Sequence, residues 1–141
     1  MTLQQYILDT DTVTYQQAGR ESVLRRLAAL SPDRVFTTVV TLREQLRGRL
    51  TAVDHAAEGP DLLLAYDRLL ATLRYFVHVN VLPFTPAAAA TLQRLRDQRI
   101  RIGTQDMRIA AIVLAAGGTL VTSNRRDFEK VPGLTIEDWN R

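Results

Sequence analysis

The chain has 141 residues, of which 46% are hydrophobic, and its formal net charge at pH 7 is +3. This length fits a single domain with one core, spanning residues 1–141. The absence of cysteine excludes disulfide bonds, thiolate metal ligands and cysteine nucleophiles. No stretch approaches the roughly 20 apolar residues of a membrane span, and no basic segment followed by an apolar run marks a signal peptide. We therefore expect a cytoplasmic protein.

The positive charge comes almost entirely from arginine, with 17 arginines and a single lysine, Lys130. Arginine forms forked hydrogen bonds with phosphate and stacks on nucleobases, so a nucleic-acid partner fits this composition. A GC-rich genome that favours arginine codons explains the same bias without any partner. Composition alone leaves both explanations open.

Short apolar runs alternate with longer amphipathic segments along the chain. The runs expected to form β-strands are residues 6–8, 35–38, 79–84, 120–122 and 134–136. The segments expected to form helices are residues 23–30, 40–50, 60–77, 86–98 and 104–116, and a polar turn is expected after the first strand. This alternation indicates an α/β domain with a mostly parallel sheet and helices on both faces.

The helix that starts at Gly59-Pro60 carries many apolar residues. Tyr66, Leu73 and Phe76 belong to a wide apolar stripe, with Leu70 beside it. We expect this stripe to pack into the core, and docking of a partner helix is the alternative.

Four carboxylates follow strand ends or occupy early helical turns. Asp9 ends the first strand, and Asp127 comes just after the fourth. Glu44 and Asp106 lie near the starts of helices. Strand carboxyl ends and the helix starts that follow them share one edge of a parallel sheet, so all four acids are expected to converge there. Hard oxygen ligands of this kind suit Mg²⁺ or Mn²⁺, which can activate water and stabilise charge on a phosphodiester.

Each acid also has a simpler structural explanation. Glu44 follows Thr41 by three residues, as in a capping box. Asp106 could serve only to complement its helix dipole, and Asp127 could form a surface ion pair with a neighbouring arginine. Asp9 is the hardest to explain in this way, because a carboxylate on a buried strand is unfavourable unless a cation or hydrogen bonds neutralise it.

Taken in order, these segments resemble the PIN-domain ribonucleases, specifically the VapC type of toxin from bacterial type II toxin–antitoxin pairs. The resemblance covers essentially the whole chain. It rests on Tyr6-Ile7-Leu8-Asp9-Thr10-Asp11, Thr41-Leu42-Arg43-Glu44, Ile102-Gly103-Thr104-Gln105-Asp106, Leu120-Val121-Thr122-Ser123-Asn124, Asp127-Phe128 and Val131-Pro132-Gly133-Leu134.

The resemblance implies a PIN-like three-layer α/β/α sandwich with a mostly parallel four- to five-stranded sheet. It also implies an endoribonuclease that depends on Mg²⁺ or Mn²⁺, forms a homodimer and is inhibited by a small VapB-like antitoxin.

The family's ligand positions correspond to Asp9, Glu44 and Asp106. Asp127 is our choice for the fourth position, where many relatives instead carry an acid at the position of Asn124.

Several further residues have supporting roles under this hypothesis. Asn124 and Thr122 would give polar support to the acids, and Asp11 would either orient them or cap the following turn. Arg99, Arg101 and Arg108 would grip the RNA backbone. The RNA target, the identity of the antitoxin and the dimer interface are not specified by the sequence.

Two other functions fit parts of the sequence. A catalytically silent PIN domain that binds RNA or an antitoxin is the main alternative, because Asn124 departs from the family pattern. Asp9-Thr10-Asp11-Thr12 also fits the signature of haloacid-dehalogenase-type phosphatases. That mechanism needs a downstream lysine and another acidic strand, and only 11 residues follow Lys130.

Overall fold

The computed structural model describes residues 3–141, in which five strands form a single sheet with the order β3-β2-β1-β4-β5. All neighbouring strands are parallel. The expectation of a mostly parallel sheet is therefore confirmed. The strands are β1 (Tyr6–Leu8), β2 (Val35–Thr38), β3 (Asn80–Leu82), β4 (Thr119–Val121) and β5 (Thr135–Glu137).

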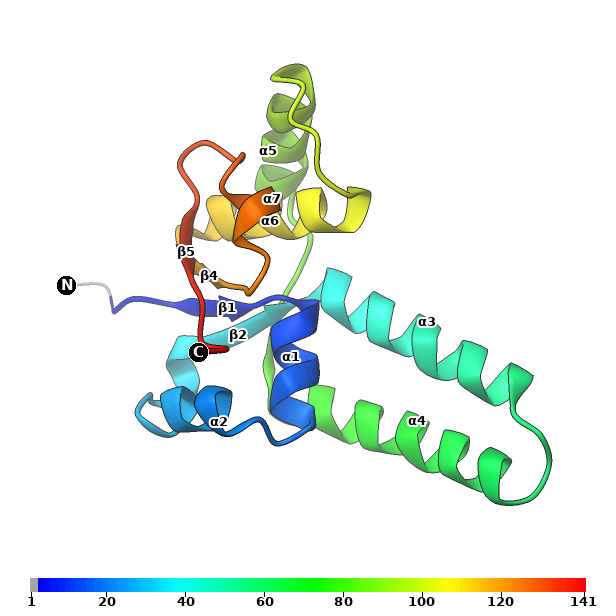
Figure 1. The fold of residues 1–141 in the computed structure, drawn as a ribbon. Coiled ribbons are helices and arrows are strands. Elements are labelled where there is room, and N and C mark those ends of the chain that lie inside the picture. The colour runs from blue at the N-terminus through cyan, green and yellow to red at the C-terminus, as the bar shows by residue number, and fades with distance from the viewer. Residues whose placement is uncertain (1–2) are drawn as a thin grey trace.

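Helices connect each strand to the next, as a parallel sheet requires (Figure 1). They are α1 (Thr10–Gln17), α2 (Glu21–Ala28), α3 (Val39–His55), α4 (Pro60–His78), α5 (Pro86–Asp97), α6 (Thr104–Ala116) and α7 (Arg125–Phe128), with a 3₁₀ turn, η1, at Pro32–Arg34. Within residues 3–141, no helix is both long and apolar enough to cross a membrane.

The sheet separates two hydrophobic clusters, because successive strand side chains point to opposite faces. Ile7 and Leu120 pack on one face with the buried residues of α5 and α6. Leu8 and Val121 pack on the other with residues of α1 and α2 and with Trp139. This arrangement is the three-layer α/β/α sandwich expected from the sequence.

Helix α1 occupies the segment for which a polar turn was expected, so that prediction was wrong. The sequence Thr-Asp-Thr-Val-Thr-Tyr-Gln-Gln carries no apolar stripe, and its threonines are weak helix formers. Two tertiary features stabilise the helix. The Asp9 side chain caps it by accepting a hydrogen bond from the Thr12 backbone N–H, and Val13 is fully buried.

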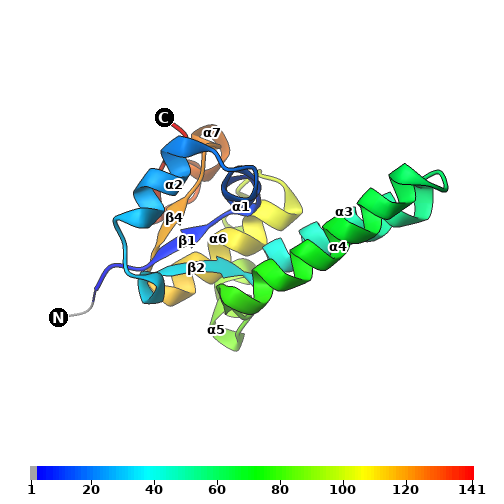
Figure 2. The same cartoon turned by 90° about the horizontal axis from the view of Figure 1, so that it is seen from below.

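Helices α3 and α4 form an antiparallel hairpin that extends well beyond the sheet (Figure 2). The expectation that the α4 stripe packs into the core is correct only for part of it. Phe76 is buried, but Leu63, Tyr66, Leu73 and Val77 are 54–70% exposed. Because the hairpin leaves the body of the domain, one face of α4 has no part of residues 3–141 to cover it.

Two glycines, Gly117 and Gly118, lie between α6 and β4. Gly117 takes a left-handed conformation with φ 71° as the C-cap of α6. A Cβ on Gly118 would clash with the end of the Ile7 side chain and lie 3.2 Å from the Gln5 carbonyl oxygen, so a larger residue here would displace the buried Ile7. The short helix α7, which the sequence analysis did not anticipate, is anchored by the fully buried Phe128.

Candidate active site at the carboxyl edge of the sheet

Asp9 lies at the carboxyl end of β1 and is only 4% exposed. Its Oδ1 accepts a hydrogen bond from the Thr12 backbone N–H at 2.9 Å. Burial raises the pKa of Asp9 above its ordinary value, while hydrogen bonds from Thr122 and Thr12 act in the opposite direction. The sheet therefore holds a carboxylate where its charge is poorly solvated, as the sequence analysis expected.

Glu44 lies in the second turn of α3 and is held by a threonine network. The Thr10 hydroxyl donates to Glu44 Oε1 at 2.8 Å and lies 3.1 Å from the Thr41 hydroxyl. The alternative of a capping box between Thr41 and Glu44 is wrong, because α3 begins one turn earlier. Its N-cap is Thr38, which accepts a hydrogen bond from the Thr41 backbone N–H. The network instead directs Glu44 toward the start of α1.

Asp106 lies in the first turn of α6, and its pKa is affected by the charges of four other carboxylates. Its pKa is raised to about 6 by partial burial and by the charges of Asp9, Glu44, Asp11 and Asp127. Carboxylates from different parts of the chain therefore act on Asp106 across the same edge of the sheet.

Asp127 lies on α7 and is bound by neutral and cationic donors. The Asn124 amide donates to its Oδ2 at 3.1 Å, and the Lys130 ammonium lies 3.6 Å from its Oδ1. These contacts lower the pKa of Asp127, with the Asn124 hydrogen bond as the larger cause. The suggested surface pairing with a neighbouring arginine is therefore wrong, since the ion-pair partner is Lys130. Asn124 also donates its backbone N–H to the Thr122 hydroxyl.

The acids lie along the same edge but do not form a complete set of metal ligands. Within residues 3–141, no three Asp, Glu or His side chains are gathered closely enough to hold a metal ion together. The donor set is made of carboxylates and hydroxyls, which are hard ligands. Mg²⁺ retains several waters and usually takes only one or two protein carboxylates, so the edge suits such an ion.

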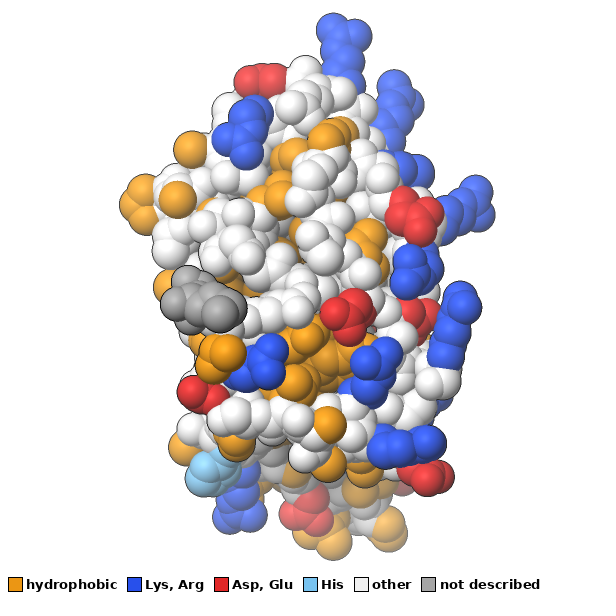
Figure 3. All heavy atoms as spheres, turned by 90° about the vertical axis from the view of Figure 1, so that its left-hand side faces the viewer, with side chains coloured by type: hydrophobic (Ala, Val, Ile, Leu, Met, Phe, Trp, Pro, Cys, Tyr) orange, Lys and Arg blue, Asp and Glu red, His pale blue; other side chains and the backbone are white. Residues whose placement is uncertain are grey.

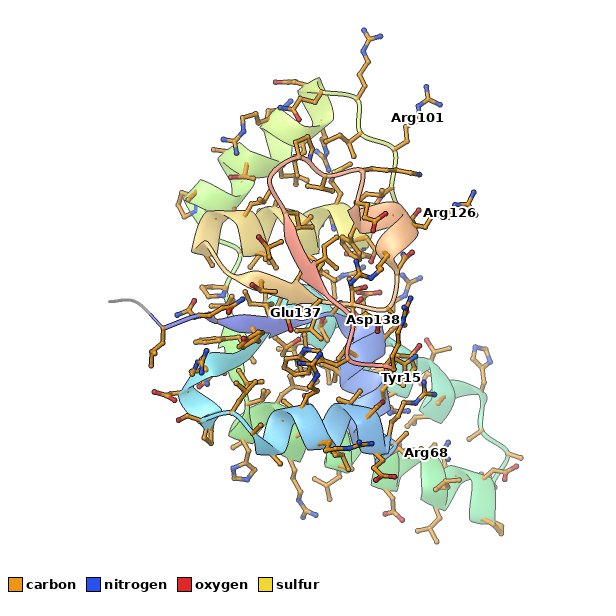
Figure 4. The ribbon with its side chains drawn as sticks, turned by 60° about the vertical axis from the view of Figure 1, so that its left-hand side comes forward. Tyr15, Arg68, Arg101, Arg126, Glu137 and Asp138 are labelled. Atoms are coloured by element: carbon orange, nitrogen blue, oxygen red, sulfur yellow. The ribbon has the colours of Figure 1, made fainter. Side chains whose placement is uncertain are left out.

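The arginines proposed to bind RNA are spread around this edge. Arg99 and Arg101 are exposed in the loop before α6, and Arg108 on α6 is partly buried. Figure 4 shows Arg101 and Arg126 both pointing outward, from that loop and from α7. In the space-filling view, lysine and arginine side chains line one edge of the molecule from top to bottom (Figure 3). The cationic groups are thus arranged along a side of the domain.

Two positions at this edge were not predicted from the sequence to belong to the site. Thr10 orients Glu44, and Lys130 joins Asp127 to the backbone carbonyl of Arg101 through a 3.3 Å hydrogen bond. Each follows a candidate ligand by one to three residues, which is the only sequence signal that could have indicated them.

Comparison with known proteins agrees with the fold. The PIN-domain family matches residues 6–134. The chain is 30% identical over 139 residues to the tRNA(fMet)-specific endonuclease VapC of Salmonella typhimurium, covering 95% of this chain and 97% of that relative.

Solved structures have the same fold. DNA-bound VapBC from Salmonella typhimurium matches with a TM-score of 0.77 and 25% identity, covering 97% of this chain and 99% of that one. The toxin–antitoxin protein VapBC-5 from Mycobacterium tuberculosis matches with a TM-score of 0.62 and 30% identity, covering 96% and 98%.

Proposed function

This chain belongs to the PIN-domain family, and on that premise we propose that it is the endoribonuclease toxin of a toxin–antitoxin pair, with the acidic edge as its active site. The observation that supports this most directly is the buried Asp9 carboxylate, 4% exposed at the end of β1, with Glu44 held beside the start of α1 by the Thr10 hydroxyl. The pKa of Asp106 is in addition raised to about 6, first by burial and then by the charges of other carboxylates at this edge. An assembly of like charges at the carboxyl edge of a parallel sheet is unfavourable by itself, and a divalent cation relieves it.

In this proposal Asp9 and Asp106 hold the metal ion directly. Glu44 and Asp127 complete its surroundings, in part through water. We propose Mg²⁺ or Mn²⁺, because carboxylate and hydroxyl oxygens without histidine or cysteine favour these ions. When bound, such an ion supplies a more acidic water and positive charge beside the phosphodiester that is cleaved.

The remaining residues position these groups and the RNA. Thr12 and Thr122 hold Asp9 in a fixed orientation, and Asn124 does the same for Asp127. Asp11 is exposed in the first turn of α1, where it adds negative charge to the edge. Arg99, Arg101 and Arg108 would contact backbone phosphates, for which forked guanidinium donors are well suited.

The proposed partners are a small VapB-like antitoxin, a second copy of the chain in a homodimer, and the RNA substrate. The exposed face of α4 supports a protein partner, since Leu63, Tyr66 and Leu73 are more than half exposed there. Large apolar patches of this kind usually mark an interface. We place the protein in the cytoplasm, where such an RNA substrate would be met.

The test uses antitoxin-free protein and a mixed RNA pool, with Mg²⁺ or Mn²⁺ compared against EDTA. Asp9→Asn and Asp106→Asn should each lower metal-dependent cleavage by at least about 100-fold. Substitution of residues that only orient metal ligands typically lowers activity by about 10–100-fold, and loss of a direct ligand should lower it at least as much. Asp54→Asn is the matched control, because Asp54 is exposed at the far end of α3. Cleavage that survives both substitutions would contradict the proposed site.

The second candidate is a domain that binds RNA or an antitoxin without cleaving. The ion pair between Lys130 and Asp127 favours it, because the lysine already neutralises one of the four acids. Calorimetric titration with Mg²⁺ or Mn²⁺ separates the two functions. Binding that disappears in Asp9→Asn supports the nuclease, and absence of binding supports the silent domain.

A further inference from the structure

A hollow of about 310 Å³ lies beside the acidic edge, between α3 and the start of α6. It adjoins the candidate site at two points, because Glu44 lines it and Gln105 immediately precedes Asp106. Its lining residues are Arg43, Glu44, Arg47, Gly48, Thr51 and Gln105. None of the functions assigned above uses this hollow.

The rim of the hollow carries two cations on one face of α3. Arg43 and Arg47 are four residues apart, which places them one turn apart on the same side of the helix. Both are exposed, and neither forms an ion pair with a carboxylate among residues 3–141. Two free guanidinium groups at this spacing can bind one phosphate from two sides.

Gln105, which lines the hollow, carries an unpaired polar atom. Gln105 Oε1 is buried and has no hydrogen-bond partner within the described chain, the one such side-chain atom found there. A buried amide oxygen without a donor is unfavourable, so this side chain gains from any ligand that supplies one. Gly48 lines the same hollow and leaves open space there, since a Cβ built on it has no neighbour within 4 Å.

We propose that this hollow binds the nucleotide next to the cleaved phosphodiester. Arg43 and Arg47 hold a backbone phosphate of that nucleotide, and the Gln105 amide turns toward the hydrogen-bonding edge of its base over Gly48. The inference rests on the proposed ribonuclease function and adds the residues that select one base of the target. An amide has both a donor and an acceptor, so it distinguishes bases by the pattern on their edges.

The first test measures RNA binding without cleavage, in EDTA, by fluorescence anisotropy with a short single-stranded RNA pool of random sequence. The double variant Arg43→Gln, Arg47→Gln should bind at least tenfold more weakly. Its salt dependence should be less steep by about 0.7 in log K against log salt for each phosphate that the variant no longer binds. The matched control removes two exposed arginines of α4, Arg68→Gln with Arg74→Gln, and should bind as the native chain does.

Two further variants test the hollow without changing its charge. Gly48→Leu fills the open space at an exposed helical position and should weaken RNA binding to a similar extent. Gln105→Met keeps the size of the side chain but removes its amide. It should flatten the base preference at one position of the cleaved sequence, and an unchanged preference would contradict the role of Gln105.

The outcomes separate this inference from the proposed function. If cleavage depends on Asp9 but the Arg43, Arg47 double variant binds RNA like its control, the inference is overturned and the nuclease stands. If the double variant keeps RNA binding and loses only antitoxin binding, the hollow belongs to the protein partner and the inference is again wrong. A native chain that neither binds nor cleaves RNA would overturn both.

Discussion

The acidic edge of the sheet and the α3–α4 hairpin depart from ordinary protein surfaces in opposite ways. At the edge, carboxylates are buried or partly buried: Asp9 is only 4% exposed, and the pKa of Asp106 is raised to about 6. On the hairpin, apolar groups are left outside, with Val77 70% exposed. Each departure is unfavourable for the isolated chain and favourable once a partner is bound. A bound cation would therefore stabilise the acidic edge, and a bound protein would stabilise the exposed face of the hairpin.

The largest expected difference between the two regions is in folding stability. Phe128→Ala should lower the free energy of unfolding by about 3–5 kcal/mol, because the side chain is fully buried beside the acidic edge. Leu73→Ala on α4 should change it by less than about 0.5 kcal/mol, because that side chain is 55% exposed. Urea unfolding measures both. Similar losses in the two variants would show that the hairpin face is covered in solution.

The second effect concerns the protein partner of the hairpin. Leu63→Glu and Leu70→Glu place charge on the exposed face of α4 and should weaken antitoxin binding by at least about tenfold, or 1.4 kcal/mol. The free energy of unfolding should stay nearly unchanged. Arg68→Glu on the same helix is the control for added negative charge. Unaltered antitoxin affinity would show that the antitoxin binds another surface.

A smaller effect is expected from the residue that orients Glu44. Thr10→Val keeps the shape of the side chain but removes the hydroxyl that donates to Glu44 Oε1 at 2.8 Å. RNA cleavage should fall by about tenfold, near the lower limit for residues that orient a metal ligand. Thr14→Val, at an exposed position one turn later in α1, is the control. Equal cleavage by the two variants would show that Thr10 has no role in the site.

The smallest effect is a dependence of stability on pH. Because the pKa of Asp106 is raised from 3.8 to about 6, the folded state holds its proton longer than the unfolded state does. Stability should therefore fall as pH rises from about 4 to about 6, and this loss should persist above pH 6. Solvent screening at a partly exposed site reduces the effect to roughly 1 kcal/mol.

Thermal unfolding can detect this change, since 1 kcal/mol shifts Tm by roughly 2–8 °C in domains of this size range. Asp106→Asn should raise the Tm of the metal-free protein at pH 7 and reduce the dependence between pH 4 and 6, leaving the part that comes from the raised pKa of Asp9. Added Mg²⁺ should raise the Tm of the native chain and have little effect on the variant. A variant that is less stable than the native chain at pH 7 would contradict strong repulsion at this position.

Much of this arrangement could be predicted from the sequence because it follows from local pattern. Helix α5 starts at Thr85-Pro86, and the Thr85 side chain accepts a hydrogen bond from the Ala88 backbone N–H as expected for an N-cap. The strand ahead of Asp9 is short but apolar, which was enough to place the carboxylate at a sheet edge.

Other features depend on contacts that no local pattern reports. Helix α1 forms because Asp9 caps it and Val13 is buried, not because its residues favour helix. The periodicity of α4 predicts an amphipathic helix but cannot tell whether Leu73 is covered by the same chain or by another. The partner of Asp127 is Lys130 rather than a nearer arginine, because the turn after α7 brings residue 130 back to it.

The order of the strands has a consequence for the synthesis of the protein. The central strand β1 pairs with β2 and also with β4, which is made more than a hundred residues later. Asp9 emerges from the ribosome early, but the segments that surround it, around Asp106 and Asp127, emerge among the last. Such distant contacts form late in folding. A nascent or truncated chain therefore lacks the assembled acidic edge. The proposed nuclease activity can arise only when translation of the chain is nearly complete.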